Sequence, residues 1–144
     1  MNDPELPQNE AFIKVKFVSC IRQVDQVTKE LLRHFTRHGG REDLFALELV
    51  IRETLVNAVV HGNRSDRSKA VSCSLCVLAD MFRFTVKDEG AGFDWRGQLS
   101  RTTIDEDSTS GRGLFLAKSY GYDLSFNEAG NEICLSRSFP DKSN

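Results

Sequence analysis

The chain has 144 residues and a mass of 16.2 kDa, which is the size of one compact domain. Its composition, 40% apolar and 28% charged residues, predicts a soluble globular protein and excludes a disordered tail or a fibre. With 19 basic and 21 acidic residues there is no excess positive charge for a nucleic-acid partner. The polar, acidic first residues are unlike a secretory signal, and no apolar run approaches about 18 residues. We therefore expect a cytoplasmic protein without a membrane partner.

The first part of the sequence predicts a strand followed by a helix. Apolar and basic residues alternate over 13–18, which is typical of a strand with one solvated face. Apolar residues at three-to-four spacing predict a helix from about Gln23 to His38, ended by the pair Gly39-Gly40. Within it, His34 lies one turn before His38. No cluster of carboxylates or thiols accompanies the two imidazoles, so we predict a solvated face instead of a metal site.

The middle of the sequence predicts a second helix and a hairpin. Residues from about Glu42 to His61 carry an apolar stripe, and Gly62 is available as a left-handed cap of this helix. Two runs typical of strands follow, at about 70–78 and 82–87. The short corner at 79–81 between them predicts an antiparallel hairpin.

The last part of the sequence alternates loops with short elements. Asp88-Glu89-Gly90-Ala91-Gly92 is a glycine-rich turn, and the long polar stretch 94–110 after it is typical of a lid or a binding segment. A third helix is predicted from Leu114 to about Tyr120. Two final strands are predicted at about 123–127 and 132–138.

The order of these elements predicts the fold class. Hairpins with helices between them favour an α/β (α+β) two-layer sandwich over a doubly wound parallel fold. We expect a mixed, mostly antiparallel sheet of about five strands that three helices cover on one face. The domain would span residues 12–138, between a polar tail at 1–11 and a C-terminal tail at 139–144.

The four cysteines, Cys20, Cys73, Cys76 and Cys134, do not predict a metal site. Cys73 and Cys76 have the spacing of half a zinc site, but no second half exists. In a strand, residues three apart point to opposite faces. We therefore predict buried or half-buried reduced thiols.

Polar residues recur every four positions in the otherwise apolar second helix. Glu53, Asn57 and His61 form one stripe on its surface. The stripe could be a solvent-facing edge, or the wall of a cleft that meets a ligand or an ion, because buried carboxylates and amides need partners.

Two glycine-rich segments could also face a ligand. Asp88 would place a carboxylate at the rim of the sheet, where the glycines at 90 and 92 let a ligand approach the backbone, although Asp-x-Gly is also a common turn. The glycines at 111 and 113 before the third helix could form an anion site or a simple hinge. Neither a Walker loop nor the dinucleotide fingerprint is present.

In combination these motifs resemble those of the Bergerat, or GHKL, ATP-binding fold. Glu53-x-x-x-Asn57-x-x-x-His61-Gly62-Asn63 is similar to its N box, Asp88-x-Gly90-x-Gly92 to its adenine-binding box, and Gly111-x-Gly113-Leu114 to its glycine box. Within that superfamily, the short chain and the residue pattern of the N box most resemble bacterial anti-sigma factor serine/threonine kinases of the RsbW and SpoIIAB type. The resemblance covers about residues 12–138.

The resemblance implies a role for each matching residue. Asn57 would offer an oxygen to Mg²⁺, and Glu53 would accept the proton of an incoming serine or threonine hydroxyl. Asp88 would accept from the adenine amino group, which selects ATP over GTP. The residues expected to bind nucleotide are Asn57, Asp88, Gly90, Gly92, Phe93, Gly111, Arg112, Gly113 and Leu114.

The sequence departs from the family pattern in two places. Gly130-Asn131 stands where a Gly-Thr pair often supports the adenine-binding aspartate. Thr109 and Ser110 precede the first glycine of the glycine box, where related kinases can carry a basic residue, and Arg112 lies between the glycines. Loss of charge there would weaken phosphoryl transfer more than nucleotide binding.

The implied function is an anti-sigma factor that phosphorylates a small anti-anti-sigma partner of the STAS type and sequesters a sigma factor. The alternative is an ATP-binding partner-switching module without phosphotransfer. A histidine kinase or a gyrase-like ATPase is not expected in 144 residues. The resemblance also implies a homodimer, for which the first strand, about 12–18, offers a candidate edge.

Overall fold

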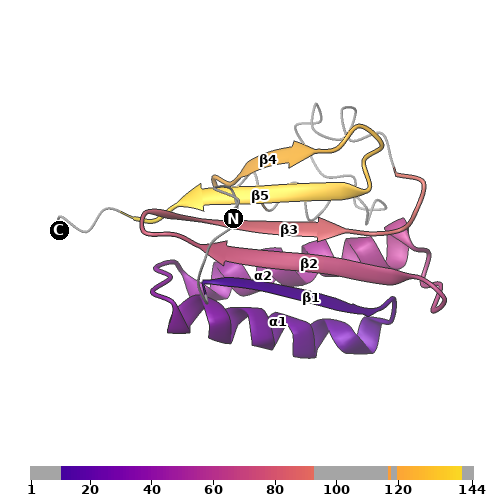
Figure 1. Ribbon diagram of the computed structural model, residues 1–144, viewed down its shortest axis with the longest axis horizontal. Coiled ribbons are helices and arrows are strands. Elements are labelled where there is room, and N and C mark those ends of the chain that lie inside the picture. The colour runs from indigo at the N-terminus through magenta and orange to yellow at the C-terminus, as the bar shows by residue number, and fades with distance from the viewer. Residues whose placement is uncertain (1–10, 93–116, 118–119, 141–144) are drawn as a thin grey trace, which may run out of the picture.

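The computed structural model describes residues 11–92, 117 and 120–140 (Figure 1). The five predicted strands are confirmed, and so are the first two helices. In chain order the elements are β1 (Phe12–Val18), α1 (Ile21–Arg37), α2 (Leu44–Val56), the π-helical segment η1 (Asn57–Gly62), β2 (Ala70–Val77), β3 (Met81–Lys87), β4 (Asp123–Phe126) and β5 (Glu132–Ser138).

The five strands form one sheet in the order β1-β2-β3-β5-β4, and every neighbouring pair is antiparallel. The prediction of a mixed sheet was therefore wrong. The reason lies in the crossover from β1 to β2, where Val18 at the end of β1 pairs with Ala70 at the start of β2. Two successive helices carry the chain away from this end of the sheet and back again, so β2 starts where β1 finished and runs in the opposite direction (Figure 1).

One face of the sheet is buried against the helices, as predicted. Buried and less buried residues alternate along β3, where Phe82, Phe84 and Val86 point into the core, while Arg83 and Lys87 are exposed. The helices supply the other side of this core through Val24, Val27, Leu31, Phe35, Leu47, Val50, Ile51 and Leu55. The predicted third helix lies mostly outside the described residues, although Ala117 is buried in the same core.

The start of α2 has a clear local cause. The side chain of Asp43 accepts hydrogen bonds from the backbone N–H groups of Phe45 and Ala46, which satisfies donors that the first turn leaves free. This N-cap sets the start of the helix at Leu44, two residues later than predicted. None of the helices in the described residues is long and apolar enough to cross a bilayer.

The prediction of a solvated histidine face was wrong for His34. This side chain is buried, and its Nε2 donates to the backbone oxygen of Ala11 at 2.8 Å. The hydrogen bond fastens the C-terminal part of α1 to the residue that precedes β1. It gives His34 a partner within the fold, which spacing along one helix cannot reveal.

All four cysteines are free thiols that are buried or partly buried, as predicted. Phe139, the first residue of the expected C-terminal tail, is also buried. Its ring stacks on that of Phe82, with the centroids 5.7 Å apart.

We predict that Phe82→Ala destabilises the protein by about 3–5 kcal/mol, because it leaves a cavity among three aromatic rings. The Phe82 ring is 0% exposed and lies 5.1 Å from that of Phe35 and 5.8 Å from that of Tyr122, centroid to centroid. The matched control is Phe45→Ala, since Phe45 is 74% exposed and its loss should change stability by about 0.5 kcal/mol or less. Urea unfolding measures both, and equal losses would contradict this account of the core.

Candidate functional site

The polar stripe lies at the C-terminal end of α2, where the backbone changes from α- to π-helical hydrogen bonding. Glu53 is in the last turn of α2, and Asn57 begins η1. Both side chains are partly buried, whereas His61 is exposed. Short π-helical segments that interrupt or end an α-helix often lie at functional sites. The stripe is thus neither a fully solvated edge nor a sealed interior, as suits the wall of a binding site.

The prediction that Gly62 is a left-handed cap was wrong. Gly62 belongs to η1, and the chain continues through Asn63 before it turns. The left-handed conformations fall on Arg64 and Ser65, with φ of 54° and 57°. Non-glycine residues pay a steric cost in this region. The backbone N–H of Ser65 donates to Val59 O at 2.8 Å, which ties this turn to the π-helical segment.

Gly62 is needed for packing against Asp88. A Cβ atom at residue 62 would lie 2.2 Å from Oδ2 of Asp88, so only a glycine lets the carboxylate approach this closely. Gly90 also packs closely against Gly62, because a Cβ atom at residue 90 would lie 1.9 Å from the backbone oxygen of Gly62. The structure therefore brings the N box and the adenine-binding box into direct contact.

Asp88 lies just after β3, and its side chain is buried. Its Oδ1 accepts from the backbone N–H of Gly90 at 2.8 Å, and its own N–H donates to Asn131 O at 2.9 Å. Within the described part of the chain, Oδ2 accepts no hydrogen bond. A buried carboxylate oxygen without a hydrogen-bond donor is suited to bind a ligand that carries an N–H group.

The glycines at 90 and 92 were expected to let a purine lie against the backbone. The structure gives both a role within the protein. A Cβ atom at Gly92 would lie 1.7 Å from the backbone oxygen of Ala129, and the φ of Gly92 is +91°. The adenine-binding box is thus packed between the end of η1 and the β4–β5 turn.

The β4–β5 turn is held by two asparagines. The Oδ1 atom of Asn127 accepts from the backbone N–H groups of Gly130, Asn131 and Glu132. Nδ2 of Asn131 donates to the backbone oxygen of Gly90 at 3.3 Å. Asn131, where the resemblance led us to expect a threonine, therefore supports the Asp88–Gly92 turn through the backbone of Gly90. No described contact joins its side chain to the carboxylate of Asp88.

Asn63 is the residue whose importance the sequence did not reveal. Its side chain is fully buried and accepts from the N–H of Glu89 at 2.7 Å. Its Nδ2 donates to the backbone oxygen of Ala70 at 3.0 Å. The only signal in the sequence is its place at the end of the N box, and its burial requires the fold.

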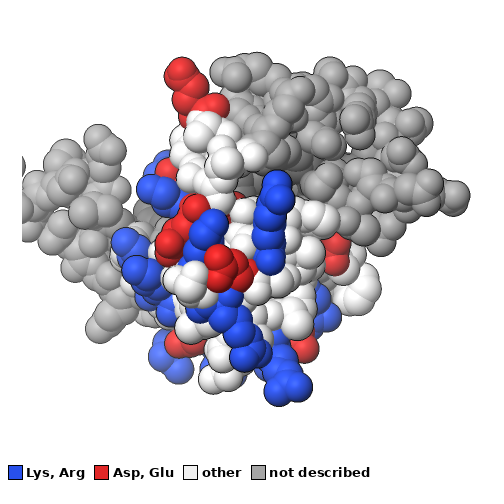
Figure 2. Space-filling model, turned by 90° about the vertical axis from the view of Figure 1, so that its right-hand side faces the viewer, with Lys and Arg blue, Asp and Glu red and all other residues white. Residues whose placement is uncertain are grey.

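The electrostatics of the site centre on Asp88. Burial raises the pKa of this carboxyl above its ordinary value, while the Gly90 N–H and the positive charge of Lys69 oppose that shift. Figure 2 looks onto the end of the sheet at which β3 finishes, and Lys and Arg side chains are interspersed there with Asp and Glu. The site thus combines a poorly solvated carboxylate with nearby positive charge.

Several predicted site residues lie outside the described residues. They are Phe93, Gly111, Arg112, Gly113 and Leu114, together with the expected lid at 94–110. In the described part of the chain no group of three or more His, Cys, Asp or Glu side chains is placed to hold a metal ion. Asn57, the residue predicted to hold a metal, lies within the described residues.

Comparison with known proteins identifies the family. The model of the histidine kinase-like ATPase domain matches residues 18–137, which include the whole of the site described above. The chain belongs to this family. An ATPase domain implies that the protein binds ATP.

Curated relatives narrow the resemblance further. The chain is 28% identical over 116 residues to the anti-sigma F factor of Geobacillus stearothermophilus, covering 78% of this chain and 70% of that one. It is also 28% identical over 118 residues to the anti-sigma F factor of Bacillus thuringiensis (strain Al Hakam), covering 80% of this chain and 72% of that one. These relatives agree with the predicted resemblance to GHKL anti-sigma kinases.

We predict that Gly92→Ala destabilises the protein much more than Gly39→Ala. Both glycines have a positive φ, +91° and +86°, so an alanine meets a backbone cost of about 1–2 kcal/mol at either position. Only Gly92 has a neighbour in the way, and we expect overpacking to add about 1–3 kcal/mol there. A Cβ atom at Gly39 meets nothing within 4 Å. Urea unfolding of the pair isolates the contact with Ala129, and equal losses would argue against it.

We also predict that Asp88→Asn makes the nucleotide-free protein more stable at neutral pH. Because burial raises the pKa of Asp88, the folded protein holds this proton more tightly than the unfolded chain, whose carboxyl titrates near about 3.9. The stability of the wild type should therefore fall as the pH rises from about 4 through the folded pKa. The Asn variant removes this fall while keeping an acceptor for Gly90.

Melting temperatures of both proteins between about pH 3 and pH 8 measure this effect. The difference in favour of the variant should be small at the acidic end and grow with pH. A difference that is constant with pH, or a variant less stable than the wild type at pH 7, would mean that the Asp88 carboxylate is not destabilised by burial.

Proposed function

We propose that this protein is a cytoplasmic anti-sigma factor with ATP-dependent serine/threonine kinase activity. It would phosphorylate a small anti-anti-sigma partner of the STAS type and sequester a sigma factor. The observation that carries the proposal is the direct packing of the N box on the adenine-binding box. The contact of Gly62 with Asp88 supports a single site, in which Glu53 would be the base, Asn57 the magnesium ligand and Asp88 the carboxylate that selects a purine.

The described residues would contact Mg·ATP at its adenine and at its magnesium ion. The Oδ2 atom of Asp88 has no partner in the described part of the chain and would accept from the adenine amino group. A guanine would present a carbonyl oxygen there, which a carboxylate repels. Asn57 would hold Mg²⁺ through its side-chain oxygen, and the bound ion would neutralise charge on the phosphates. The glycine box, including Gly111 and Gly113, would hold the phosphates.

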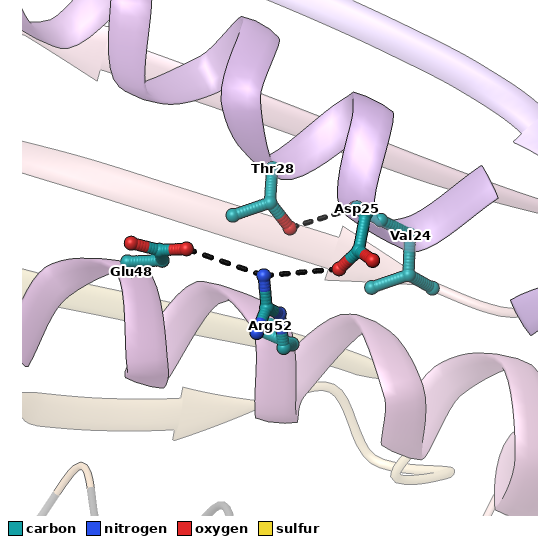
Figure 3. A network of polar contacts seen from close by, with 5 residues as sticks. All are labelled: Val24, Asp25, Thr28, Glu48 and Arg52. Atoms are coloured by element: carbon teal, nitrogen blue, oxygen red, sulfur yellow. Dashed lines mark hydrogen bonds and ion pairs between the residues drawn. The ribbon is translucent and has the colours of Figure 1, made fainter. Parts of the chain in front are cut away.

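Glu53 is suited to act as the general base. No described residue forms an ion pair or hydrogen bond with its carboxylate, so its oxygens are available to a substrate hydroxyl. The neighbouring cation, Arg52, is occupied elsewhere: it lies 3.0 Å from Asp25 on α1 and 3.2 Å from Glu48 on α2 (Figure 3). In the proposed reaction Glu53 would take the proton from the serine or threonine oxygen as that oxygen bonds to the γ-phosphorus. The bond between the γ-phosphorus and the β–γ bridging oxygen would break, and ADP would leave.

The proposed partners follow from the relatives. Proteins named anti-sigma F factor match this chain over about four fifths of its length. We infer a sigma factor of the same kind as the sequestered partner, with the anti-anti-sigma protein as phosphoacceptor. A homodimer would place two such sites in one particle, and the exposed edge of β1 remains the candidate surface.

The test is phosphate transfer from radiolabelled Mg·ATP to a candidate small anti-anti-sigma protein of the STAS type. We expect Glu53→Gln to slow transfer by about 10²-fold or more, since a positioned general base contributes about that much. Its affinity for Mg·ADP should stay within about twofold, because the base does not hold nucleotide. Asp88→Asn should instead lose nucleotide binding.

Glu48→Gln is the matched control, because it makes the same chemical change on the same helix at a residue that faces Arg52. It should keep the wild-type rate. A fully active Glu53→Gln would remove Glu53 as the base. A wild type that binds Mg·ATP but never modifies the partner would leave the alternative, a partner-switching module without phosphotransfer.

A further inference from the structure

We propose that Asn63 is a positioning residue that couples the magnesium end of the nucleotide site to the adenine end. The inference rests on the proposed binding of Mg·ATP and adds a residue to which the comparisons assign no role. Asn63 immediately follows η1, the segment that starts with Asn57, and its side chain reaches the backbone beside Asp88. It is therefore the side chain that physically joins the two boxes.

Both halves of the Asn63 amide form hydrogen bonds, one with the turn after β3 and the other with the start of β2. Oδ1 accepts from the N–H of Glu89, which follows β3, and Nδ2 donates to the oxygen of Ala70, which begins β2. Because Asn63 is 0% exposed, water cannot replace either hydrogen bond without a change in packing. An asparagine is suited to this place because it offers one donor group and one acceptor on a short side chain.

A third hydrogen bond completes the connection. The Oε2 atom of Glu89 accepts from the N–H of Ala70 at 2.9 Å. Asn63, Ala70 and Glu89 therefore form a closed set of three hydrogen bonds around the point where Gly62 packs on Asp88. A shift of η1 relative to the adenine-binding turn would break the hydrogen bond between Asn63 and Glu89.

The backbone around Asn63 shows how firmly its position is set. Its own N–H donates to Ala58 O at 2.9 Å, in the register of the π-helical segment. Its carbonyl accepts from the N–H of Asp66 at 3.0 Å. The chain then takes two successive left-handed residues, Arg64 and Ser65. A strained turn of this kind persists only where surrounding contacts determine it.

The proposed role of Asn63 affects ligands that bind at the magnesium end and at the adenine end of the site together. Mg·ADP would use Asn57 for the metal and Asp88 for the base, so its affinity depends on the distance between η1 and the adenine-binding turn. ADP without magnesium depends less on Asn57. If Asn63 fixes that distance, its removal should weaken Mg·ADP binding and should also reduce the gain in affinity that magnesium provides.

The experiment compares Asn63→Ala and the milder Asn63→Ser with wild type, by calorimetry with ADP in magnesium and in EDTA. Thr28→Val is the matched control. Thr28 is also 0% exposed and its hydroxyl donates to a backbone oxygen, Val24 O at 2.7 Å, but it lies on α1 away from the site. We expect the Asn63 variants to bind Mg·ADP about tenfold more weakly, the effect of about one buried hydrogen bond, and the control to stay within about twofold.

Asn63 variants that bind Mg·ADP within about twofold of wild type, or an unchanged magnesium gain, would overturn the inference. A wild type that binds no ADP at all would overturn the proposed function instead. Hydrogen exchange on the wild type serves if both variants fail to fold. The amide of Glu89 must then be among the slowly exchanging amides and become slower with Mg·ADP, whereas fast exchange in the wild type would refute the role of Asn63.

Discussion

The site depends on the contact between the end of a helix and a turn at the rim of the sheet. Gly62 has no side chain, so the Asp88 carboxylate packs directly against it, and Gly90 packs against its carbonyl. A methyl group at either glycine would push the two segments apart. The end of η1 and the carboxylate after β3 lie in contact because these two glycines permit the approach.

The all-antiparallel sheet makes this contact possible. Because two helices lie between β1 and β2, the chain returns to the end of the sheet where β1 finished, and η1 ends there as well. β3 runs back to that same end and finishes just before Asp88. The β4–β5 turn lies there too, since Asn131 O accepts from Asp88 N–H. Three segments far apart in sequence thus converge at one end through topology alone.

The sequence predicted the five strands and the first two helices well, because these elements leave local signals. Alternation along β3 and the repeat of Glu53 and Asn57 at four-residue spacing are visible without a fold. The errors share one cause, which is that they concern contacts across the fold. His34 is buried because of a carbonyl at Ala11, and the turn after the N box is made by Arg64 instead of Gly62. No periodicity along one helix contains that information.

Contacts across the fold also explain why the sequence predicted only part of the role of the glycines. A glycine in a sequence indicates that another group of atoms approaches the backbone closely. We expected this group to be a ligand. At residues 62, 90 and 92 the neighbour is the protein itself. The two readings are compatible, because a turn held by its own packing presents Asp88 in one fixed direction. Preorganisation of this kind reduces the ordering cost of binding, so packing between the boxes and recognition of a purine would rest on the same few backbone contacts.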